Sequence, residues 1–543
     1  MKSSSKLRGI MTMFTRRTFL AGSAAIPFFS YTSLLDAYAD TPKDMLVVAQ
    51  QLDNMTSLDP HEGFEGVGTE MGSNIYQRLV RANRDKPTEI DGDLAESWKA
   101  SEDGKSITFK IRKEAKFSSG NQVTAEDAAF SLQRAVIMNK TPAFIITQFG
   151  FDKDNVASAI KATDAGTLVI TLAEPTSPSF LLYCLSANVG SIVEKKAVMA
   201  QEKDGDLGNN WLRNNSAGSG FFSLRAWKPS ESVMLDVNPH SLYKSKMKRI
   251  IFRHIVDPSA QLLMLQKGDV DVARNLTTEQ LRVLQNDANY NLVSQGVATL
   301  VVISLNQKNS NLAKPEVWQA VKWALDYDGI QKNIVPLTHK VHQSFLPGGY
   351  PGAVMDKPFK RDVAKAKELM QKAGLADGFD IAMDHYANQP YPDMAQAIQA
   401  NLADIGIRVK LQAAENRAVL TKMRARQHEV ALTAWGADYF DPHTNAEAFC
   451  INPDNSDDSK RRTFCWRSAY QSKEMNEAAE TALREIDATK RIALYDKLQR
   501  DHMDNSPFTI LLQSVYTAAC RKNVDGVWIG ILSNGTYEKV VKA

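Results

Sequence analysis

The alternation of hydrophobic and polar positions along the chain predicts strands interleaved with amphipathic helices. Short runs rich in β-branched residues and free of glycine and proline are typical of strands, whereas apolar positions repeated every three to four residues are typical of helices. Strands are expected at residues 45–49, 106–111, 168–172 and 299–305, and helices at 315–326, 363–373, 391–404 and 472–504. This succession of elements predicts an α/β fold with mixed sheets covered by helices.

Residues 1–39 have the pattern of a secretion signal. A basic segment comes first, a stretch of apolar and small residues follows at 19–33, and Ala37-Tyr38-Ala39 provides a small-x-small cleavage site. Thr15-Arg16-Arg17-Thr18-Phe19-Leu20 resembles the twin-arginine export motif. We expect the mature chain to start near Asp40 and to reach the periplasm by the twin-arginine pathway. The alternatives are a buried N-terminal helix or a membrane anchor.

The length and charge of the chain indicate how many compact units it forms and which partners it can bind. A chain of 543 residues with 43% hydrophobic residues is long enough for two or three compact units. Residues 1–39 contain five basic residues and one acid, Asp36, so their removal changes the formal net charge by −4, from +3 to −1. A nearly neutral mature chain has no basic surface for phosphates, which argues against a nucleic-acid partner. We expect a monomer.

Four cysteines, at positions 184, 450, 465 and 520, would enter an oxidising compartment after export. Cys450 and Cys465 bracket a polar, turn-rich stretch, and we expect a disulfide between them. In the loop-entropy model such a bond stabilises the folded chain by roughly 3 kcal/mol. Cys184 is expected to be a buried free thiol and Cys520 is a second candidate, while the sequence leaves the pairing state of both open.

Motifs for catalysis are not found in the sequence. There is no His-Glu-x-x-His, Gly-x-Ser-x-Gly or Cys-x-x-Cys. His339 and His342 have helical spacing, but they lie between prolines in an expected loop and no carboxylate completes a ligand set. We therefore expect no catalytic residues, no metal and no cofactor.

A series of short segments resembles the family 5 extracellular solute-binding proteins, which include the oligopeptide- and dipeptide-binding receptors of bacterial ABC importers. Their order and spacing carry the resemblance across essentially the whole mature chain. The main segments are Leu58-Asp59-Pro60-His61, Asn74-Ile75-Tyr76-Gln77-Arg78-Leu79, Leu94-Ala95-Glu96-Ser97-Trp98, Val123-Thr124-Ala125-Glu126-Asp127, Gly218-Ser219-Gly220-Phe221-Phe222 and Leu265-Gln266-Lys267-Gly268-Asp269.

The resemblance implies a two-lobe periplasmic binding protein that closes over its ligand by hinge bending. Lobe I would comprise residues 40–300 and 510–543, with an extra subdomain at about 84–190, and lobe II would comprise residues 301–509. The two chain crossings between the lobes are expected near residues 299–306 and 508–516.

The resemblance also implies ligand-binding residues. In the peptide-binding relatives, the Asp that matches Asp438 meets the ligand's ammonium group, and Trp435, Gly436 and Tyr439 lie in the same segment. A carboxylate facing a cation in a closed cleft makes a strong, charge-assisted hydrogen bond. The alternative for this segment is a structural turn, because Asp-Pro favours turns and Trp is often part of a core.

Glu65 and Val67 match a segment that lines the cleft from the other lobe in oligopeptide binders. The alternative for this segment is a polar surface loop.

One departure from the family limits the ligand prediction. Well-known oligopeptide binders carry Arg three positions before the Trp, whereas this chain has Leu432 there, with Arg424 further upstream. We expect the partners to be a peptide or small-molecule ligand bearing an amine and the permease subunits of an ABC transporter. The alternatives are a secreted hydrolase or a binding protein that serves a chemosensory receptor.

Overall fold

A computed structural model of the protein describes residues 41–543. The predicted signal peptide, with its twin-arginine motif, lies outside the described residues. In residues 41–543, no helix is both long and apolar enough to cross a bilayer.

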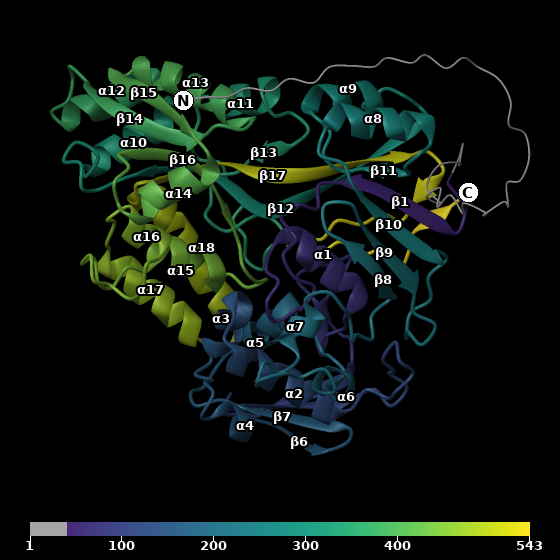
Figure 1. Cartoon of the computed structure of the whole chain (residues 1–543). Coiled ribbons are helices and arrows are strands. Elements are labelled where there is room, and N and C mark those ends of the chain that lie inside the picture. Colours follow the sequence, from purple (N-terminus) through teal and green to yellow (C-terminus); the bar gives the residue numbers. More distant parts are fainter. Residues whose placement is uncertain (1–40) are drawn as a thin grey trace, which may run out of the picture. The chain divides into compact units, whose positions relative to one another are not determined.

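The centre of the fold is a mixed sheet of 11 strands (Figure 1). At one end β1 is parallel to β10 and β11, and at the other end β14 is parallel to β15 and β16. The order is β15-β14-β16-β12-β17-β11-β1-β10-β9-β8, and β13 also pairs with β17. The strands are β1 Met45–Gln50, β8 Phe222–Lys228, β9 Ser232–Val237, β10 Arg249–His254, β11 Val272–Ala273, β12 Tyr290–Leu305, β13 His339–Val341, β14 Phe379–Tyr386, β15 Ile407–Ala414, β16 Val430–Gly436 and β17 Phe508–Arg521.

Two long antiparallel strands, β12 and β17, join the two ends of this sheet (Figure 1). β17 pairs with β11 on one side, and β12 pairs with β16 on the other. The register between β12 and β17 shifts between Gly296 and Leu300. β12 starts at Tyr290, before the strand predicted at 299–305. The apolar pattern did not predict its first part, because that part is partly exposed and polar.

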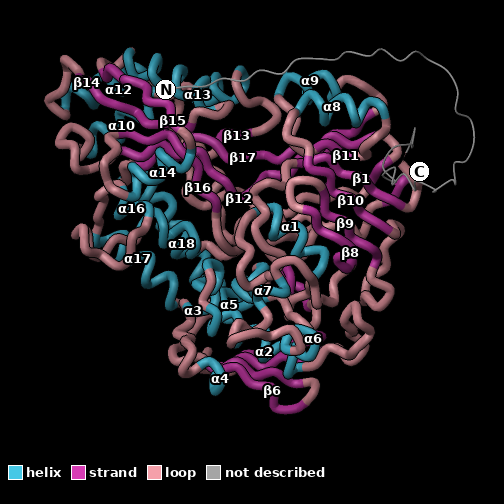
Figure 2. Tube along the Cα trace, viewed as in Figure 1, coloured by secondary structure: helices cyan, strands magenta, loops and turns pink. Residues whose placement is uncertain are grey.

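A smaller antiparallel sheet lies against helix α2, as Figure 2 shows. Its order is β4-β5-β7-β6, with β4 Ala95–Ala100, β5 Ser106–Ile111, β6 Ile160–Asp164 and β7 Thr167–Thr171. The residues of the family-like segment Val123 to Asp127 start a helix. Thr124 and Asp127 form a capping box at the N-terminus of α2, Ala125–Met138. A separate hydrophobic cluster, centred on residues such as Phe109 and Leu132, fills the space between helix and sheet.

Helices cover the sheets and form a separate group before β17. The predicted helix at 472–504 is wrong in one respect: it is two helices, because the backbone is extended at Glu485 and the Asp487 side chain caps a new helix. These two helices are α17 Lys473–Arg484 and α18 Ala488–Asn505. Besides them and α2, the helices of the described chain are α1 Gly66–Ile75, η1 Thr141–Ala143, α3 Phe144–Thr147, α4 Val156–Ala159, α5 Pro178–Leu185, η2 Asn188–Gly190, α6 Lys195–Met199, α7 Asn209–Leu212, α8 Pro258–Lys267, α9 Thr278–Gln285, α10 Pro315–Ala324, α11 Tyr327–Asn333, α12 Val363–Lys372, α13 Tyr391–Ala403, α14 Asn416–Arg424, α15 His443–Cys450 and α16 Phe464–Arg467. Four short strands, β2 Val80–Ala82 with β3 Ile90–Gly92 and β18 Val524–Asp525 with β19 Val541–Lys542, form two separate pairs.

The predicted disulfide between Cys450 and Cys465 is absent: all four cysteines are buried free thiols. The polar stretch between these two is held by hydrogen bonds instead. Arg426 Nη1 donates to the Asn455 carbonyl oxygen at 2.8 Å, and Trp466 Nε1 donates to the Ser456 carbonyl oxygen at 2.7 Å. The prediction failed because a turn-rich sequence shows that a loop must be closed, but not which interaction closes it.

Glycines of the Gly218-Ser219-Gly220 segment let the chain pass directly over the end of α1. A Cβ atom at Gly218 would lie 2.1 Å from the Ile75 carbonyl oxygen, and one at Gly220 would lie 2.4 Å from that of Asn74. The Gly220 N–H donates to the Ile75 carbonyl oxygen at 2.9 Å. This close approach fixes the C-terminal end of α1.

A buried charge network attaches the segment Asp59-Pro60-His61 to α2. Arg134 donates to both carboxylate oxygens of Asp59, at 2.9 and 2.6 Å, and to His61 Nδ1 at 2.7 Å. Burial and the nearby Arg134 charge lower the pKa of His61 to about 4, so this imidazole is neutral. Its Nε2 then donates to the Ser191 carbonyl oxygen at 3.0 Å.

We predict that Arg134→Met lowers the free energy of unfolding by about 3–5 kcal/mol, because it leaves the Asp59 carboxylate buried without its partner. Urea unfolding followed by circular dichroism measures this change. The matched control is Glu126→Gln on the same helix, which breaks an exposed ion pair with Lys195 and should have little effect. Equal losses in the two variants would contradict the role given to the buried network.

Candidate functional site

A cavity of about 200 Å³ lies where segments distant in the sequence meet. It is lined by residues from the segments 64–69, 142–145, 186–189, 298–299, 436–438 and 531–534, together with Arg78. The structure therefore brings the first turn of α1 and the end of β16 to one cavity. These are the two segments from which the sequence predicted ligand contacts.

The end of β16 presents Asp438 to this cavity. Gly436 pairs with Thr299 of β12, and the Ala437 N–H donates to the Ala298 carbonyl oxygen at 2.9 Å. The chain then leaves the sheet, and the Asp438 N–H donates to Thr444 Oγ1 at 3.0 Å. Gly436 and Asp438 both line the cavity.

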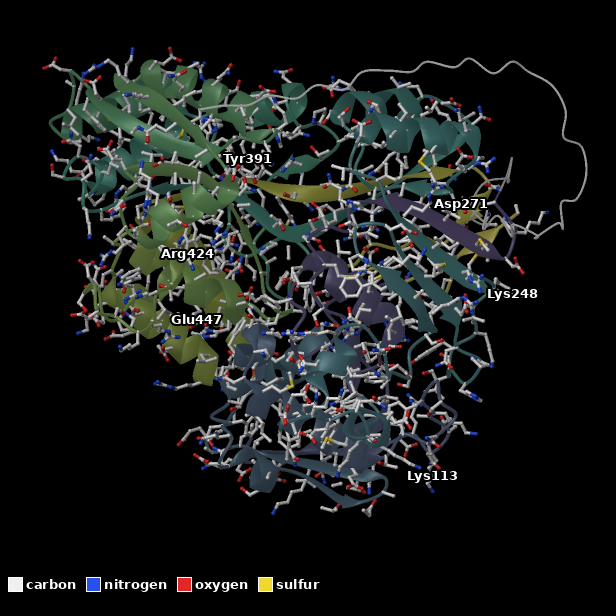
Figure 3. The ribbon with its side chains drawn as sticks, in the orientation of Figure 1. Lys113, Lys248, Asp271, Tyr391, Arg424 and Glu447 are labelled. Carbon is white, nitrogen blue, oxygen red and sulfur yellow. The ribbon has the colours of Figure 1, made fainter. Side chains whose placement is uncertain are left out.

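The Asp438 carboxylate has no hydrogen-bond or ion-pair partner among the described residues. Partial burial and the nearby Glu447 carboxylate raise its pKa to about 7, although the Arg467 guanidinium opposes this shift. Glu447 lies on α15, in the green-to-olive part of the chain that also carries Arg424 (Figure 3). An unpaired carboxylate with a raised pKa is a group for which a cation would be a favourable partner.

A buried ion pair fixes the chain just after Asp438. Arg491 on α18 donates to both carboxylate oxygens of Asp441, each at 2.7 Å, and both side chains are almost fully buried. The Asp441 carboxylate also accepts the His443 N–H at 2.8 Å. The Phe180 ring of α5 lies 5.1 Å from the Arg491 guanidinium. The loop is thus anchored to both α18 and α5.

Trp435 and Tyr439 flank Asp438, but neither lines the cavity. Trp435 Nε1 donates to Asn445 Oδ1 at 3.2 Å, its ring packs edge-on against Phe449 and Phe464, and Arg467 lies 5.8 Å from it. Tyr439 is buried in the hydrophobic cluster that also holds Phe109 and Leu132, and its hydroxyl donates to Gln148 Oε1 at 3.3 Å. Both side chains support the loop in this structure.

Glu65 and Val67 stand beside the cavity, while Gly66 between them lines it. Glu65 is the residue before α1, and its carboxylate accepts from Thr56 Oγ1 at 3.1 Å and from the Phe64 N–H at 3.2 Å. Val67 is half-buried and packs against the core beneath β1.

Sequence reasoning missed several lining residues, among them Arg78, Asn188 and Asn534. In the sequence, Arg78 belongs to a family-like segment, and its sequence neighbours do not indicate that its side chain faces a cavity. Leu432 is fully buried, and Arg424 is exposed at the end of α14 and does not line the cavity.

Comparison with known proteins identifies the family of this chain. The model described as "Bacterial extracellular solute-binding proteins, family 5 Middle" matches residues 89–457. The chain belongs to this family. It is 30% identical over 498 residues to the protein named "Probable D,D-dipeptide-binding periplasmic protein DdpA" of Escherichia coli K12, covering 90% of this chain and 92% of that protein.

Solved structures of related proteins share the two-lobe fold. DppA from Helicobacter pylori in complex with the peptide STSA is 26% identical, with a TM-score of 0.72 over 92% of this chain and 98% of that one. MoaA from A. tumefacien R10 in complex with mannopinic acid is 25% identical, with a TM-score of 0.72 over 92% of this chain and 100% of that one. This family 5 protein is thus a solute-binding protein with a mixed α/β fold.

We predict that Arg491→Met lowers the free energy of unfolding by about 3–5 kcal/mol, because it leaves the buried Asp441 carboxyl without its partner. Urea denaturation measures the loss. Arg500→Met is the matched control on the same helix, since Arg500 makes exposed ion pairs with Asp496 and Asp356. If both variants unfolded at the same urea concentration, the Asp441 pair would not be what holds the loop.

Proposed function

We propose that this protein captures a peptide or related amine-containing solute in the periplasm and delivers it to the permease of an ABC transporter. The observation that carries the proposal is the unpaired Asp438 carboxylate in a cavity built from distant segments. A ligand ammonium group there would supply the missing partner. Three of the lining groups, the Thr69, Thr299 and Ser533 hydroxyls, could orient the rest of the ligand.

The same geometry supports closure of two lobes over the ligand. The lining segments 64–69, 142–145 and 186–189 belong to proposed lobe I (40–300 and 510–543, with the subdomain at about 84–190), and 436–438 belongs to proposed lobe II (301–509). A ligand that touches both favours the closed state over the open one. Strands β12 and β17 are the proposed hinge, and the register shift at Gly296–Leu300 is where we expect them to bend.

Names of the relatives support an amine-bearing ligand without fixing it. One is named for D,D-dipeptides, one structure holds the peptide STSA and another holds mannopinic acid. The N-terminal pattern supports export by the twin-arginine pathway, and the nearly balanced charge of the composition argues against a nucleic-acid partner.

We predict that Asp438→Asn weakens binding of an amine-bearing ligand by about tenfold to a hundredfold, because a charge-assisted hydrogen bond is lost. Titration calorimetry with the dipeptides L-Ala-L-Ala and D-Ala-D-Ala measures the change. The melting temperature of the empty variant at pH 8 should not fall, since an ionised, partly buried carboxylate has been removed. Unchanged affinity in the variant would rule out Asp438 as the ammonium partner.

We also predict that affinity for an amine-bearing ligand falls by up to about tenfold for each pH unit below 7. The raised pKa of Asp438, about 7, means that its carboxyl takes up a proton in the empty protein as the pH falls through this value, and the attraction for the ammonium is lost. Above pH of about 8 the ligand's own amine loses its proton and affinity falls again. Calorimetry across pH 5–9 tests this, and Asp438→Asn should remove the acid limb only.

A further inference from the structure

Arg78 is a buried arginine that has no carboxylate partner. It is 6% exposed, and no carboxylate oxygen of the described residues lies within ion-pair distance of its guanidinium. The three other buried arginines, Arg134, Arg426 and Arg491, each pair with an aspartate at 2.6–2.8 Å. A buried cation without a counter-charge destabilises the folded state, so the unpaired Arg78 calls for a functional explanation.

Neutral acceptors hold the Arg78 side chain in place. Its Nε donates to the Ala187 carbonyl oxygen at 3.1 Å, and its Nη2 donates to Ser73 Oγ at 3.2 Å and to Asn188 Oδ1 at 3.3 Å. Its Nη1 has no hydrogen-bond partner within residues 41–543. The guanidinium is therefore oriented by two segments while one of its ends stays available.

The nearest carboxylate is engaged elsewhere. Asp93 accepts the Arg78 backbone N–H at 3.0 Å and Gln77 Nε2 at 2.6 Å, and it also accepts the Tyr243 hydroxyl at 3.3 Å. Burial lowers the pKa of Arg78 to about 10, partly offset by Asp93, so the guanidinium is still charged at neutral pH.

Helix α1 packs closely against one of the acceptors of Arg78. A Cβ atom at Gly72 would lie 2.3 Å from Asn188 Oδ1, so glycine at this position leaves room for the Asn188 side chain that accepts from Arg78.

The cavity that contains Asp438 also contains Arg78, and these two are the only charged residues among those that line it. One cation and one acid, neither with an ion-pair partner, share a space otherwise lined by apolar, hydroxyl and amide groups. Such a space suits a molecule that carries both charges.

We propose that Arg78 binds an anionic group of the ligand, so that the ligand is a zwitterion with its ammonium group at Asp438 and a carboxylate or similar oxyanion at Arg78. This inference rests on the proposed function, since it assigns a second charge to the same ligand. A guanidinium presents several N–H groups in a fixed plane, which suits an oxyanion better than a neutral carbonyl. The anionic group would be the counter-charge that Arg78 lacks among the described residues.

The test uses the whole exported protein and three dipeptide libraries: free acids, C-terminal amides and N-acetylated free acids. Native mass spectrometry reports which members the protein retains. We expect the wild type to retain free acids at least about tenfold better than the matching amides. Arg78→Met should abolish this preference, while Arg78→Lys should keep part of it.

Arg81→Met is the matched control, because Arg81 lies three positions further along over the Tyr243 ring at 4.5 Å and does not line this cavity. It should keep the preference for free acids. If the wild type retains amides as well as free acids, the role of Arg78 is overturned and the peptide function stands. If it retains none of the three libraries, the role of Arg78 fails together with the peptide part of the proposed function. The acid-to-amide comparison in the wild type needs no variant, so a poorly folded Arg78→Met does not prevent a decision.

Discussion

The buried ion pair between Asp441 and Arg491 is the interaction on which the geometry of the cleft depends. It joins the loop that follows β16 to α18, and the Phe180 ring of α5 packs against it. Asp438 lies three residues before this anchor, at the point where the chain leaves the sheet. Taking two charges out of water is costly unless each is satisfied, and the two short hydrogen bonds of this pair meet that condition.

Some buried or partly buried charges of this protein form ion pairs, and others have no ion-pair partner. Asp59 with Arg134 and Asp441 with Arg491 are closed, buried pairs that connect elements of the fold. Arg78 and Asp438 face one cavity, and neither has an ion-pair partner among the described residues. A paired charge contributes to holding the structure, whereas an unpaired one retains its capacity to bind. In a chain with a nearly neutral composition, this difference is where specificity can arise.

Much of the local structure could be predicted because its causes are local. Apolar runs matched β1, β5 and β7, and the capping box of Thr124 explains a family-like segment. The disulfide prediction was wrong because distant contacts decided the outcome. The loop between Cys450 and Cys465 is held by Arg426 and Trp466 rather than by a disulfide. Tyr439 packs against Phe180 of α5, and its predicted contact with a ligand stays a prediction.

The sequence by itself determined the fold class, because periodicity, caps and glycine turns act over a few residues. Its resemblance to family 5 implied the family and the candidate segments around Glu65 and Asp438. Only the tertiary structure decided that Arg78 and Asp438 share a cavity. Their side chains come from α1's following loop and from the end of β16, which meet through the pairing of β12 with β16 and the packing of Gly72 on Asn188. Whether a charge has a partner depends on such contacts, and no spacing within one segment reveals them.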